Sequence, residues 1–436
     1  MRKNMPCWSN ESLDVKCAVI LMAEKVETIY DAIIVGAGPA GLSAALELAK
    51  GKANVLVLDR KQEIGCPKRC AEGLSNRYFK IMNIKPNPAW AVQEIKGAVL
   101  YGPNGKQIKM KDKAVMGYVL ERKMFEKELA IDAVKKGAKI LLKHQVVAAT
   151  REDGIVKLDV EVNNKIHQFY GKIILACDGI DSLVARMMGL NTKNNLNDTD
   201  SGYQYEMTGI TGYDENCLHL FFGTEVAPRG YVWIFPKREG TANVGIGIGA
   251  YVSAQTKLTA KDYLDRWIAN QVGLKNGSII EVNAGGIPVG GFLEKMTGDN
   301  LLVAGDAGHM VDPIHGGGIG IAMEGGKLSG TIALKAIKAN KFTDDFISGY
   351  TKEWFDIRGN LLKKRLKSRH LLEQLTDDDF NYLAESITMD DALKIGNGTL
   401  SKTEMVILFT KKLVQRPGLV KIMMKYLSEG KSEAQF

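Results

Sequence analysis

The chain has few cysteines and no long apolar run. Its six cysteines, spread over 436 residues, do not suit the disulfide framework of a small secreted domain. Cys66 and Cys70 are separated by three residues, and no CxxC pair and no matching histidine pair accompany them, so we expect no metal site. No stretch approaches the roughly 20 apolar residues that span a bilayer. These absences predict a reduced, cytoplasmic protein.

Basic runs interleaved with aromatic residues are also missing. The net charge is +8, which is modest for a chain of this length. Without such runs, the charge does not predict nucleic-acid binding. It suits anionic partners instead, such as phosphates or anionic lipid.

A glycine-rich turn follows the first strand-like run. Gly36, Gly38 and Gly41 form a GxGxxG pattern between the apolar residues 31–35 and a predicted helix. In such a turn the first glycine permits the bend, the second lets a pyrophosphate approach, and the third lets the helix pack closely. Asp59 ends the next strand at the distance expected for binding a ribose 2′-hydroxyl. The pattern predicts a site for FAD or NAD and disfavours the 2′-phosphate of NADP.

The pattern of a second glycine-rich loop distinguishes between FAD and NAD. Asp306 follows the apolar residues 300–304, and four glycines within residues 316–320 precede a helix expected to begin at Ile321. Asp306 is placed to hold ribityl hydroxyls. Bare backbone N–H groups near a helix N-terminus stabilise negative charge, here that of a reduced flavin ring. A loop this rich in glycine is costly in chain entropy, which favours a functional loop and FAD.

Aromatic residues cluster near residue 230. Tyr231 and Trp233 alternate along a predicted strand and therefore share one face. Phe221, Phe222 and Phe235 add aromatic surface nearby. Aromatic faces stabilise partial positive charge. On these residues alone, a cross-strand cluster in an ordinary core is the favoured interpretation.

The order of three motifs resembles the flavoprotein monooxygenase-like superfamily. The GxGxxG turn comes first, Asp178, Gly179 and Arg186 follow in a CDGxxSxxxR motif, and residues 305–309 read GDAGH. Retention of the middle motif keeps an aromatic hydroxylase using NAD(P)H and oxygen open as an alternative. A halogenase ranks third.

Two further segments resemble the geranylgeranyl reductase branch of that superfamily. Residues 228–236 match PxxYxWxFP, and residues 69–73 resemble the cysteine-containing loop of these reductases. The resemblance covers roughly residues 29–390. It implies an α/β fold with a Rossmann-type FAD-binding domain like that of p-hydroxybenzoate hydroxylase, an antiparallel-sheet substrate domain and a C-terminal helical region.

The expected domain boundaries follow from the motifs and the resemblance. We expect an N-terminal extension over residues 1–28, a discontinuous FAD-binding domain over 29–90, 115–190 and 285–335, a β-rich substrate domain over 91–114 and 191–284, and a helical region over 336–436. Between residues 146 and 170 the pattern predicts two strands joined by a turn at Asn163 and Asn164.

The resemblance and the motifs together assign site residues. The predicted FAD-binding residues are Gly36, Gly38, Ala40, Gly41, Asp59, Arg60, Cys70, Ala71, Arg122, Val146, Asp178, Gly179, Asp306, Gly317, Gly318 and Ile319. The predicted substrate wall consists of Tyr231, Trp233, Phe235 and Phe222. The predicted catalytic residues are Cys70, Tyr231, Trp233 and His315.

Some of these residues have a structural alternative. Lys68 and Arg69 favour a thiolate at Cys70, whereas free cysteine is also common as a small buried hydrophobe. His309 and His315 are placed to donate to flavin or substrate, or else to satisfy a backbone carbonyl. Cys177 is interpreted as packing.

The implied reaction is hydrogenation of an isolated C=C bond in the geranylgeranyl chains of an archaeal polyprenyl ether phospholipid, with FAD as cofactor. The chain has no second GxGxxG unit for a nicotinamide. The resemblance implies an external electron donor, namely ferredoxin, a reduced deazaflavin or NADPH. A flavin-bearing lipid-binding or redox-sensing protein is the non-enzymatic alternative.

Basic helical segments near the C-terminus predict membrane contact. Residues 361–370 are strongly basic, and residues 414–427 mix apolar with basic residues. Such segments dock peripherally on anionic lipid. A solvated helical face is the competing interpretation.

Overall fold

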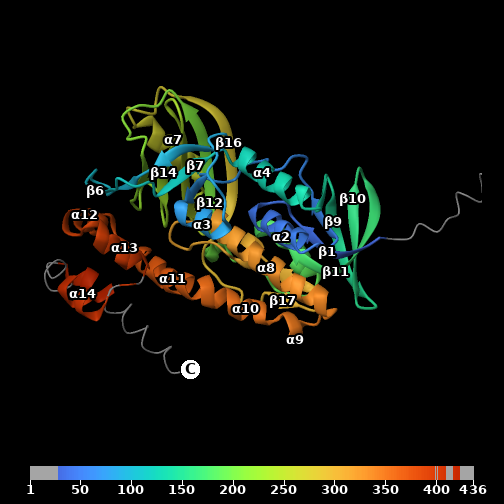
Figure 1. Cartoon of the computed structure of the whole chain (residues 1–436). Helices are drawn as coiled ribbons and strands as arrows, with labels where there is room; N and C mark the ends of the chain where they lie inside the picture. Colours follow the sequence, from blue (N-terminus) through green and yellow to red (C-terminus); the bar gives the residue numbers. More distant parts are fainter. Residues whose placement is uncertain (1–27, 398, 400, 409–415, 423–436) are drawn as a thin grey trace, which may run out of the picture.

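The computed structural model describes residues 28–397, 399, 401–408 and 416–422. The predicted N-terminal extension, apart from residue 28, and half of the basic segment 414–427 lie outside these residues. The described chain forms a nucleotide-binding part, a second β-rich part and a row of C-terminal helices (Figure 1).

The first sheet is largely parallel, and its central strands are buried. Its parallel strands lie in the order β18 (Leu301–Val303), β11 (Lys165–Ala176), β1 (Ile29–Val35), β2 (Val55–Asp59) and β8 (Lys139–Leu142), and β17 (Thr297–Gly298) pairs antiparallel at one edge. All five β2 residues are buried, as expected for a parallel strand covered on both faces. Strands β1 and β2 are joined by α2 (Pro39–Lys50), which packs against α8 (Ile319–Ala339) (Figure 1).

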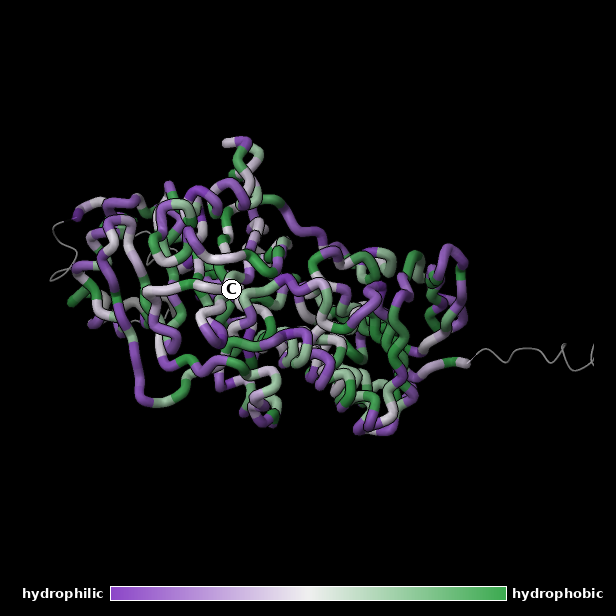
Figure 2. Tube along the Cα trace, turned by 90° about the horizontal axis from the view of Figure 1, so that it is seen from above, coloured by the Kyte–Doolittle hydropathy of each residue, from purple (hydrophilic) through white to green (hydrophobic). Residues whose placement is uncertain are grey.

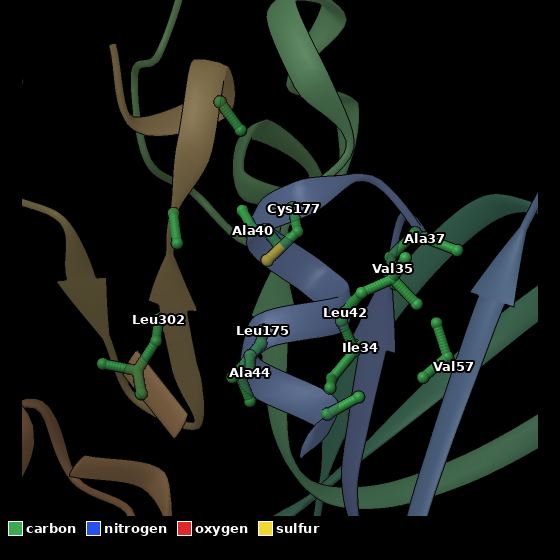
Figure 3. Packing of buried hydrophobic residues seen from close by; sticks show 14 of the residues in the cluster. Ile34, Val35, Ala37, Ala40, Leu42, Ala44, Val57, Leu175, Cys177 and Leu302 are labelled. Atoms are coloured by element: carbon green, nitrogen blue, oxygen red, sulfur yellow. The ribbon is translucent and has the colours of Figure 1, made fainter. Parts of the chain in front are cut away.

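The core of this sheet runs directly into the first glycine turn. Ile34, Leu42 and Leu175 are fully buried, and Figure 3 shows them below the turn that carries Ala37 and Ala40. Cys177 is also buried and lies beside Ala40 in the same view, which agrees with its interpretation as packing. In Figure 2 hydrophobic segments concentrate inside this part of the molecule, and hydrophilic loops lie around it.

One predicted strand boundary is wrong. The prediction ended the second strand near residue 170, but β11 continues without a break to Ala176. Its first half pairs antiparallel with β10 (Ile155–Val162), which in turn pairs with β9 (Gln145–Glu152), and its second half runs parallel to β1. The turn at Asn163 and Asn164 is confirmed, since both have positive φ, as a tight hairpin requires.

The second sheet has seven strands, and its two faces differ. The order is β16 (Ser278–Pro288), β12 (Thr199–Thr208), β15 (Thr241–Gly249), β14 (Tyr231–Pro236), β13 (Cys217–Phe221), β5 (Gly97–Tyr101) and β6 (Gln107–Lys111), and only β13 and β5 pair in parallel. Val244, Ile246 and Ile248 project from one face of β15 and pack with Leu264 of α7 (Ala260–Ala269). Because side chains alternate, Asn243, Gly245 and Gly247 lie on the opposite face.

A small third sheet carries the cysteine loop. Strands β3 (Gly73–Ser75), β7 (Gly117–Leu120) and β4 (Ala91–Ile95) pair antiparallel. Residues 66–72 lead into β3, which is followed by α3 (Asn76–Met82), and α4 (Arg122–Lys135) follows β7. Cys70 and Arg122 therefore enter the site from neighbouring strand ends.

The chain continues in a row of helices that extends from the first sheet toward the second (Figure 1). They are α9 (Asp344–Ile347), α10 (Gly349–Trp354), the π-helical turn η4 (Phe355–Gly359), α11 (Asn360–Leu372), α12 (Asp377–Ser386), α13 (Met389–Asn397) and α14 (Lys402–Ile407). Tyr350 and Trp354 anchor the row in the core of the first sheet. Among the described residues, no helix is both long enough and apolar enough to cross a membrane.

Candidate active site

The first glycine turn has the geometry that a pyrophosphate requires. A Cβ at Gly36, which has φ +103°, would lie 2.2 Å from the Cys177 carbonyl oxygen, and a Cβ at Gly41 would lie 1.9 Å from the Gly36 carbonyl oxygen. At Gly38 nothing lies within 4 Å of that position, so the backbone is approachable there. Gly38 caps α2 without a side-chain hydrogen bond, which leaves N–H groups of the first turn available to an anion. Ala40 is buried behind this turn.

Asp59 stabilises the same turn. Its carboxylate accepts hydrogen bonds from the backbone N–H groups of Ala37 and Lys61, both at 2.7 Å. The side chain is 3% exposed, so the strand end and the glycine turn are fixed to one another. The neighbouring Arg60 pairs with Asp181 at 2.6 Å on the surface.

The second motif lies beside this turn. One Asp178 carboxylate oxygen accepts from the Val184 backbone N–H at 2.9 Å, and the other is buried without a partner among the described residues. Burial raises the pKa of Asp178. Gly179 has φ +75° with open space at the Cβ position. Val146, by contrast, is a buried residue of β9 that pairs with Val160.

Asp306, Arg122 and Cys70 form one electrostatic group. Burial raises the pKa of Asp306, and the Arg122 guanidinium opposes that change. Burial also opposes the charge on Arg122, but Glu126, Cys70 and Asp306 raise its pKa above the ordinary value. The Arg122 side chain pairs with Glu126 of the same helix. The Asp306 side chain makes no hydrogen bond to any residue that the structure describes.

The second glycine loop leads into α8, which begins at Ile319, two residues earlier than predicted. Gly318 caps this helix without a side-chain hydrogen bond, and its Cβ position lies 3.4 Å from an Asp306 carboxylate oxygen. The Gly317 N–H donates to His315 Nδ1 at 3.1 Å. Two glycine-capped helix N-termini, those of α2 and α8, thus have no side-chain cap.

His315 is engaged on both sides of its ring. Its Nε2 lies 3.2 Å from an Asp312 carboxylate oxygen and 3.3 Å from Arg365 Nη1. The Asp312 carboxylate also pairs with Arg365 of α11, and His315 and Arg365 hold its pKa below the usual range although burial opposes this. The backbone carbonyl of His315 accepts from the Tyr231 hydroxyl at 2.6 Å. His309 instead contacts the Thr192 carbonyl, at 3.2 Å.

Tyr231 and Trp233 share one face of β14, as predicted. Their ring centroids lie 5.9 Å apart, and Phe222 contacts Tyr231 at 5.7 Å. Phe235 lies on the same face and approaches Gly73 of the cysteine loop. Phe221 does not belong to this wall: it stacks on Tyr101 and packs in the core behind the sheet, because it lies on the opposite side of its strand.

Buried amides tie the cysteine loop to this wall. Gln204 of β12 donates to the Cys70 carbonyl at 3.1 Å and accepts from the Trp233 indole at 2.9 Å. Asn243 of β15 donates to the Ala71 carbonyl at 3.1 Å. The loop backbone is therefore held in register with the aromatic side chains.

Glu72 is the centre of a buried ionic network behind the loop. It is fully buried and accepts from Asn243 Nδ2 at 2.7 Å and from the Arg122 backbone N–H at 2.8 Å. Lys237 lies 2.8 Å and Lys68 3.3 Å from its carboxylate. Both lysines also pair with Glu206. Every member of this group has an opposite charge beside it.

The thiolate predicted at Cys70 is not supported. Burial raises the pKa of the thiol, and the nearby Arg122 only partly offsets this. Lys68 lies two residues before Cys70 in sequence, but its ammonium group pairs with Glu72 and Glu206. Arg69 is exposed. Cys70 is therefore a neutral thiol, which suits a proton donor.

The sequence analysis did not predict four residues that contribute to the site. Glu72, Gln204 and Asn243 come together only through strand register, although polar residues within otherwise apolar strands were a usable signal. Phe380 of α12 stacks on Phe222, with ring centroids 5.9 Å apart. The C-terminal helices therefore extend the aromatic wall.

These features fit FAD. The open approach at Gly38, the two uncapped helix N-termini and the unpaired Asp306 carboxylate supply acceptors and donors for a pyrophosphate, a ribityl chain and a flavin ring. The class that the fold and this site define is a flavoprotein with a Rossmann-type FAD-binding domain.

Comparisons with known proteins identify the family. Residues 31–111 match the FAD binding domain model, and residues 198–287 match the geranylgeranyl reductase catalytic domain model. The digeranylgeranylglycerophospholipid reductase of Methanocaldococcus jannaschii is 38% identical over 366 residues, which cover 83% of this chain and 92% of that protein. The chain belongs to the geranylgeranyl reductase family, and its cofactor is FAD.

Solved structures agree with this placement. A geranylgeranyl bacteriochlorophyll reductase-like protein from Thermoplasma acidophilum superposes with a TM-score of 0.81 at 32% identity, over 92% of this chain and 100% of that one. A triple mutant of a flavin-dependent brominase gives a TM-score of 0.68 at 15% identity, over 89% of this chain and 100% of that chain, which shows a shared fold alone. This similarity supports a fold shared with the flavin-dependent halogenases and gives no support to halogenase activity.

Proposed function

We propose that this protein is an FAD-dependent reductase that saturates isolated double bonds in the geranylgeranyl chains of archaeal ether phospholipids. The observation that carries the proposal is the link between the Cys70 loop and the Trp233 wall through Gln204. It brings a proton-bearing thiol and an aromatic surface to the same side of the predicted flavin site.

Several residues would hold the cofactor. The turn around Gly36, Gly38 and Gly41 and the N-terminus of α2 would take the pyrophosphate, with Arg122 close by. Asp306 would hold ribityl hydroxyls, and the N–H groups around Gly317, Gly318 and Ile319 would face the flavin ring. The remaining proposed cofactor contacts are Ala40, Asp59, Arg60, Cys70, Ala71, Val146, Asp178 and Gly179.

The chemistry is a net addition of two hydrogens across an alkene. Reduced FAD, when bound, supplies a hydride. The Cys70 thiol donates the proton to the other alkene carbon, and the Arg122 guanidinium stabilises the thiolate that remains until solvent reprotonates it. Tyr231 and Trp233 position the chain and exclude water, while His315 holds the loop beside Tyr231.

The electron donor and the membrane contact belong to the same proposal. Ferredoxin, a reduced deazaflavin or NADPH would recharge the flavin from outside. The protein would work in the cytoplasm, on the inner face of the membrane. Helix α11 supports this, because it contains no acidic residue and exposes Lys363 and Lys364, neither of which has a carboxylate partner among the described residues.

The docking step can be tested separately. Co-sedimentation with anionic liposomes at low salt should retain the protein, and Lys363→Glu with Lys364→Glu should release it. Lys135 and Lys136, exposed at the end of α4, provide a matched charge-reversal control. No retention of the unmodified protein would exclude docking on anionic lipid.

One anaerobic experiment tests the reaction. The bound flavin is reduced with dithionite, a digeranylgeranyl ether phospholipid is added, and the lipid mass is followed. We expect a gain of two hydrogens for each double bond reduced, with reoxidation of the flavin. An unchanged lipid mass, with NADPH oxidation and oxygen uptake on an aromatic substrate, would replace the reductase with a hydroxylase.

A further inference from the structure

A row of glycines crosses the site-facing side of the second sheet. Gly247 of β15 pairs with Tyr231 of β14, Gly202 of β12 pairs with Gly247, and Gly285 of β16 pairs with Gly202. The row therefore extends from Tyr231 to the edge strand over three strand spacings, about 14 Å. We call these three glycines the glycine row.

Gly247, within the glycine row, is buried but has little packed directly against it. At Gly247 the only atom within 4 Å of a Cβ position is Trp233 Cζ3, at 3.7 Å. At Gly202 the nearest atoms belong to β16 itself, to Gly285 and Ile287. At the neighbouring pair, by contrast, Trp233 of β14 lies opposite Gly245 of β15. Its indole lies 2.4 Å from the Cβ position of Gly245 and fills the space. Trp233 on one side and Ile287 on the other thus border a strip of backbone that carries no side chains of its own.

Asn283 marks the β16 end of this strip. It lies two residues from Gly285 on the same face, pairs in register with Gln204 and is only 6% exposed. Its Nδ2 is buried without a hydrogen-bond partner, and its side chain makes no hydrogen bond to any described residue. The neighbouring amides of Gln204 and Asn243 are bonded, so Asn283 is the exception in this network. A buried amide left unsatisfied is costly, which points to a ligand oxygen as its partner.

Arg69 covers the same end. Its Cδ lies 3.2 Å from the Cβ position of Gly285, and the side chain is exposed. Within the described chain it makes no ion pair or hydrogen bond. The nearby Glu281 does not neutralise it, since that carboxylate lies 3.5 Å from Lys68 and 4.0 Å from Lys123. A free guanidinium thus sits beside an unpaired amide, a combination that suits phosphate oxygens.

We propose that Arg69 and Asn283 bind the phosphorylated glycerol head of the lipid at the β16 edge, while one prenyl chain runs along the glycine row toward Tyr231. The inference rests on the proposed function for the identity of the chain. It adds a head-group site and a direction: head at Arg69, chain toward His315 and Tyr231.

The test compares two lipids with the same prenyl chains. Oxidised, FAD-loaded protein is titrated with a digeranylgeranyl glycerol phosphate lipid and with uncharged digeranylgeranylglycerol, and binding is followed by tryptophan fluorescence. We expect Arg69→Gln to weaken binding of the phosphate lipid about tenfold, which corresponds to about 1.4 kcal/mol, and to leave the uncharged lipid unchanged. Inorganic phosphate should compete only weakly, because it lacks the chain.

Asn283→Leu separates binding from folding. It removes an unsatisfied buried amide, so we expect an equal or higher Tm together with weaker binding of the phosphate lipid. Arg266→Gln is the matched control, since Arg266 is an exposed arginine of α7 behind the opposite face. It should leave both lipids unaffected.

Three outcomes would overturn the head-group site. They are an equal loss for both lipids in Arg69→Gln, no loss for either, or a loss of FAD or an altered flavin spectrum in Asn283→Leu, which would assign the amide to the flavin. The measurement uses oxidised protein without turnover. Failure to reduce the lipid would therefore count against the proposed function and not against this site.

Discussion

The two faces of the second sheet divide stability from chemistry. The face on α7 is built from branched apolar side chains such as Val244, Ile246 and Ile248, all fully buried. The opposite face of the same strands carries glycines, amides and paired charges. Burial alone therefore does not distinguish a core from a site. What distinguishes them is whether the buried atoms are apolar or polar with fixed partners.

The largest effect is expected from Asp306→Ala, which changes the flavin site and neither face of the second sheet. Removing this carboxylate takes away the proposed ribityl contact, so we expect loss of FAD and activity together. The ratio of flavin absorbance to protein measures the first. Asp356→Ala, an exposed change in η4, is the control. Full retention of FAD by Asp306→Ala would refute the role of Asp306.

Glu72→Ala tests the polar face. It leaves Lys68 and Lys237 buried with one carboxylate fewer, so we expect a loss of about 3–5 kcal/mol in the free energy of unfolding. Urea denaturation measures this loss. The Cys70 loop should also loosen, which faster alkylation of Cys70 would report. A loss below about 1 kcal/mol would show that the network contributes little.

Ile246→Ala tests the apolar face. Truncation of this fully buried side chain should cost about 2–4 kcal/mol through lost burial and a residual cavity. FAD content and the rate per folded molecule should stay unchanged. Reduced lipid affinity in this variant would mean that the two faces are not independent.

Cys70→Ala should have the opposite effect to Ile246→Ala, lowering the rate and leaving the stability unchanged. We expect FAD and stability to be retained and alkene reduction to slow on the order of 100-fold, because the positioned proton donor is lost. Cys66→Ala, four residues earlier, is the matched control. An unchanged rate would exclude the thiol as the proton source.

The smallest effect concerns pH. Because burial raises the pKa of Cys70 above its ordinary value of 9.0, the thiol stays protonated at neutral and mildly alkaline pH. The reduction rate should therefore be flat to about pH 9 and fall only above it. A fall centred near pH 7 would mean that another group donates the proton.

The sequence predicted the nucleotide-binding part well because its signals are local. A buried strand, a glycine turn and a helix follow one another between Ile29 and Lys50, so the motif and its geometry coincide. The polar face could not be read in this way. Gln204, Asn243 and Glu72 are far apart in sequence, and only pairing of β12 with β15 and of the loop with both brings them together.

Inference from neighbouring residues also gave the wrong charge state for the Cys70 thiol. Lys68 lies two residues before Cys70 in the chain, which suggested a thiolate, but its ammonium group pairs with Glu72 and Glu206. Phe221 was misplaced for a related reason, because neighbouring residues of one strand face opposite sides. Adjacency in sequence is thus a poor guide to electrostatic neighbourhood within a strand or a loop.

Helix α11 gives the C-terminal row a role beyond covering the core. Arg365 pairs with Asp312, and Arg369 bonds both the Pro313 carbonyl and the Asp200 carboxylate. A protein shortened before this helix would leave two buried carboxylates without their cations, one of them in the loop beside the flavin site. Helix α11 is therefore not a detachable module, and a truncation that removes it also changes the loop that carries Asp312 and Pro313.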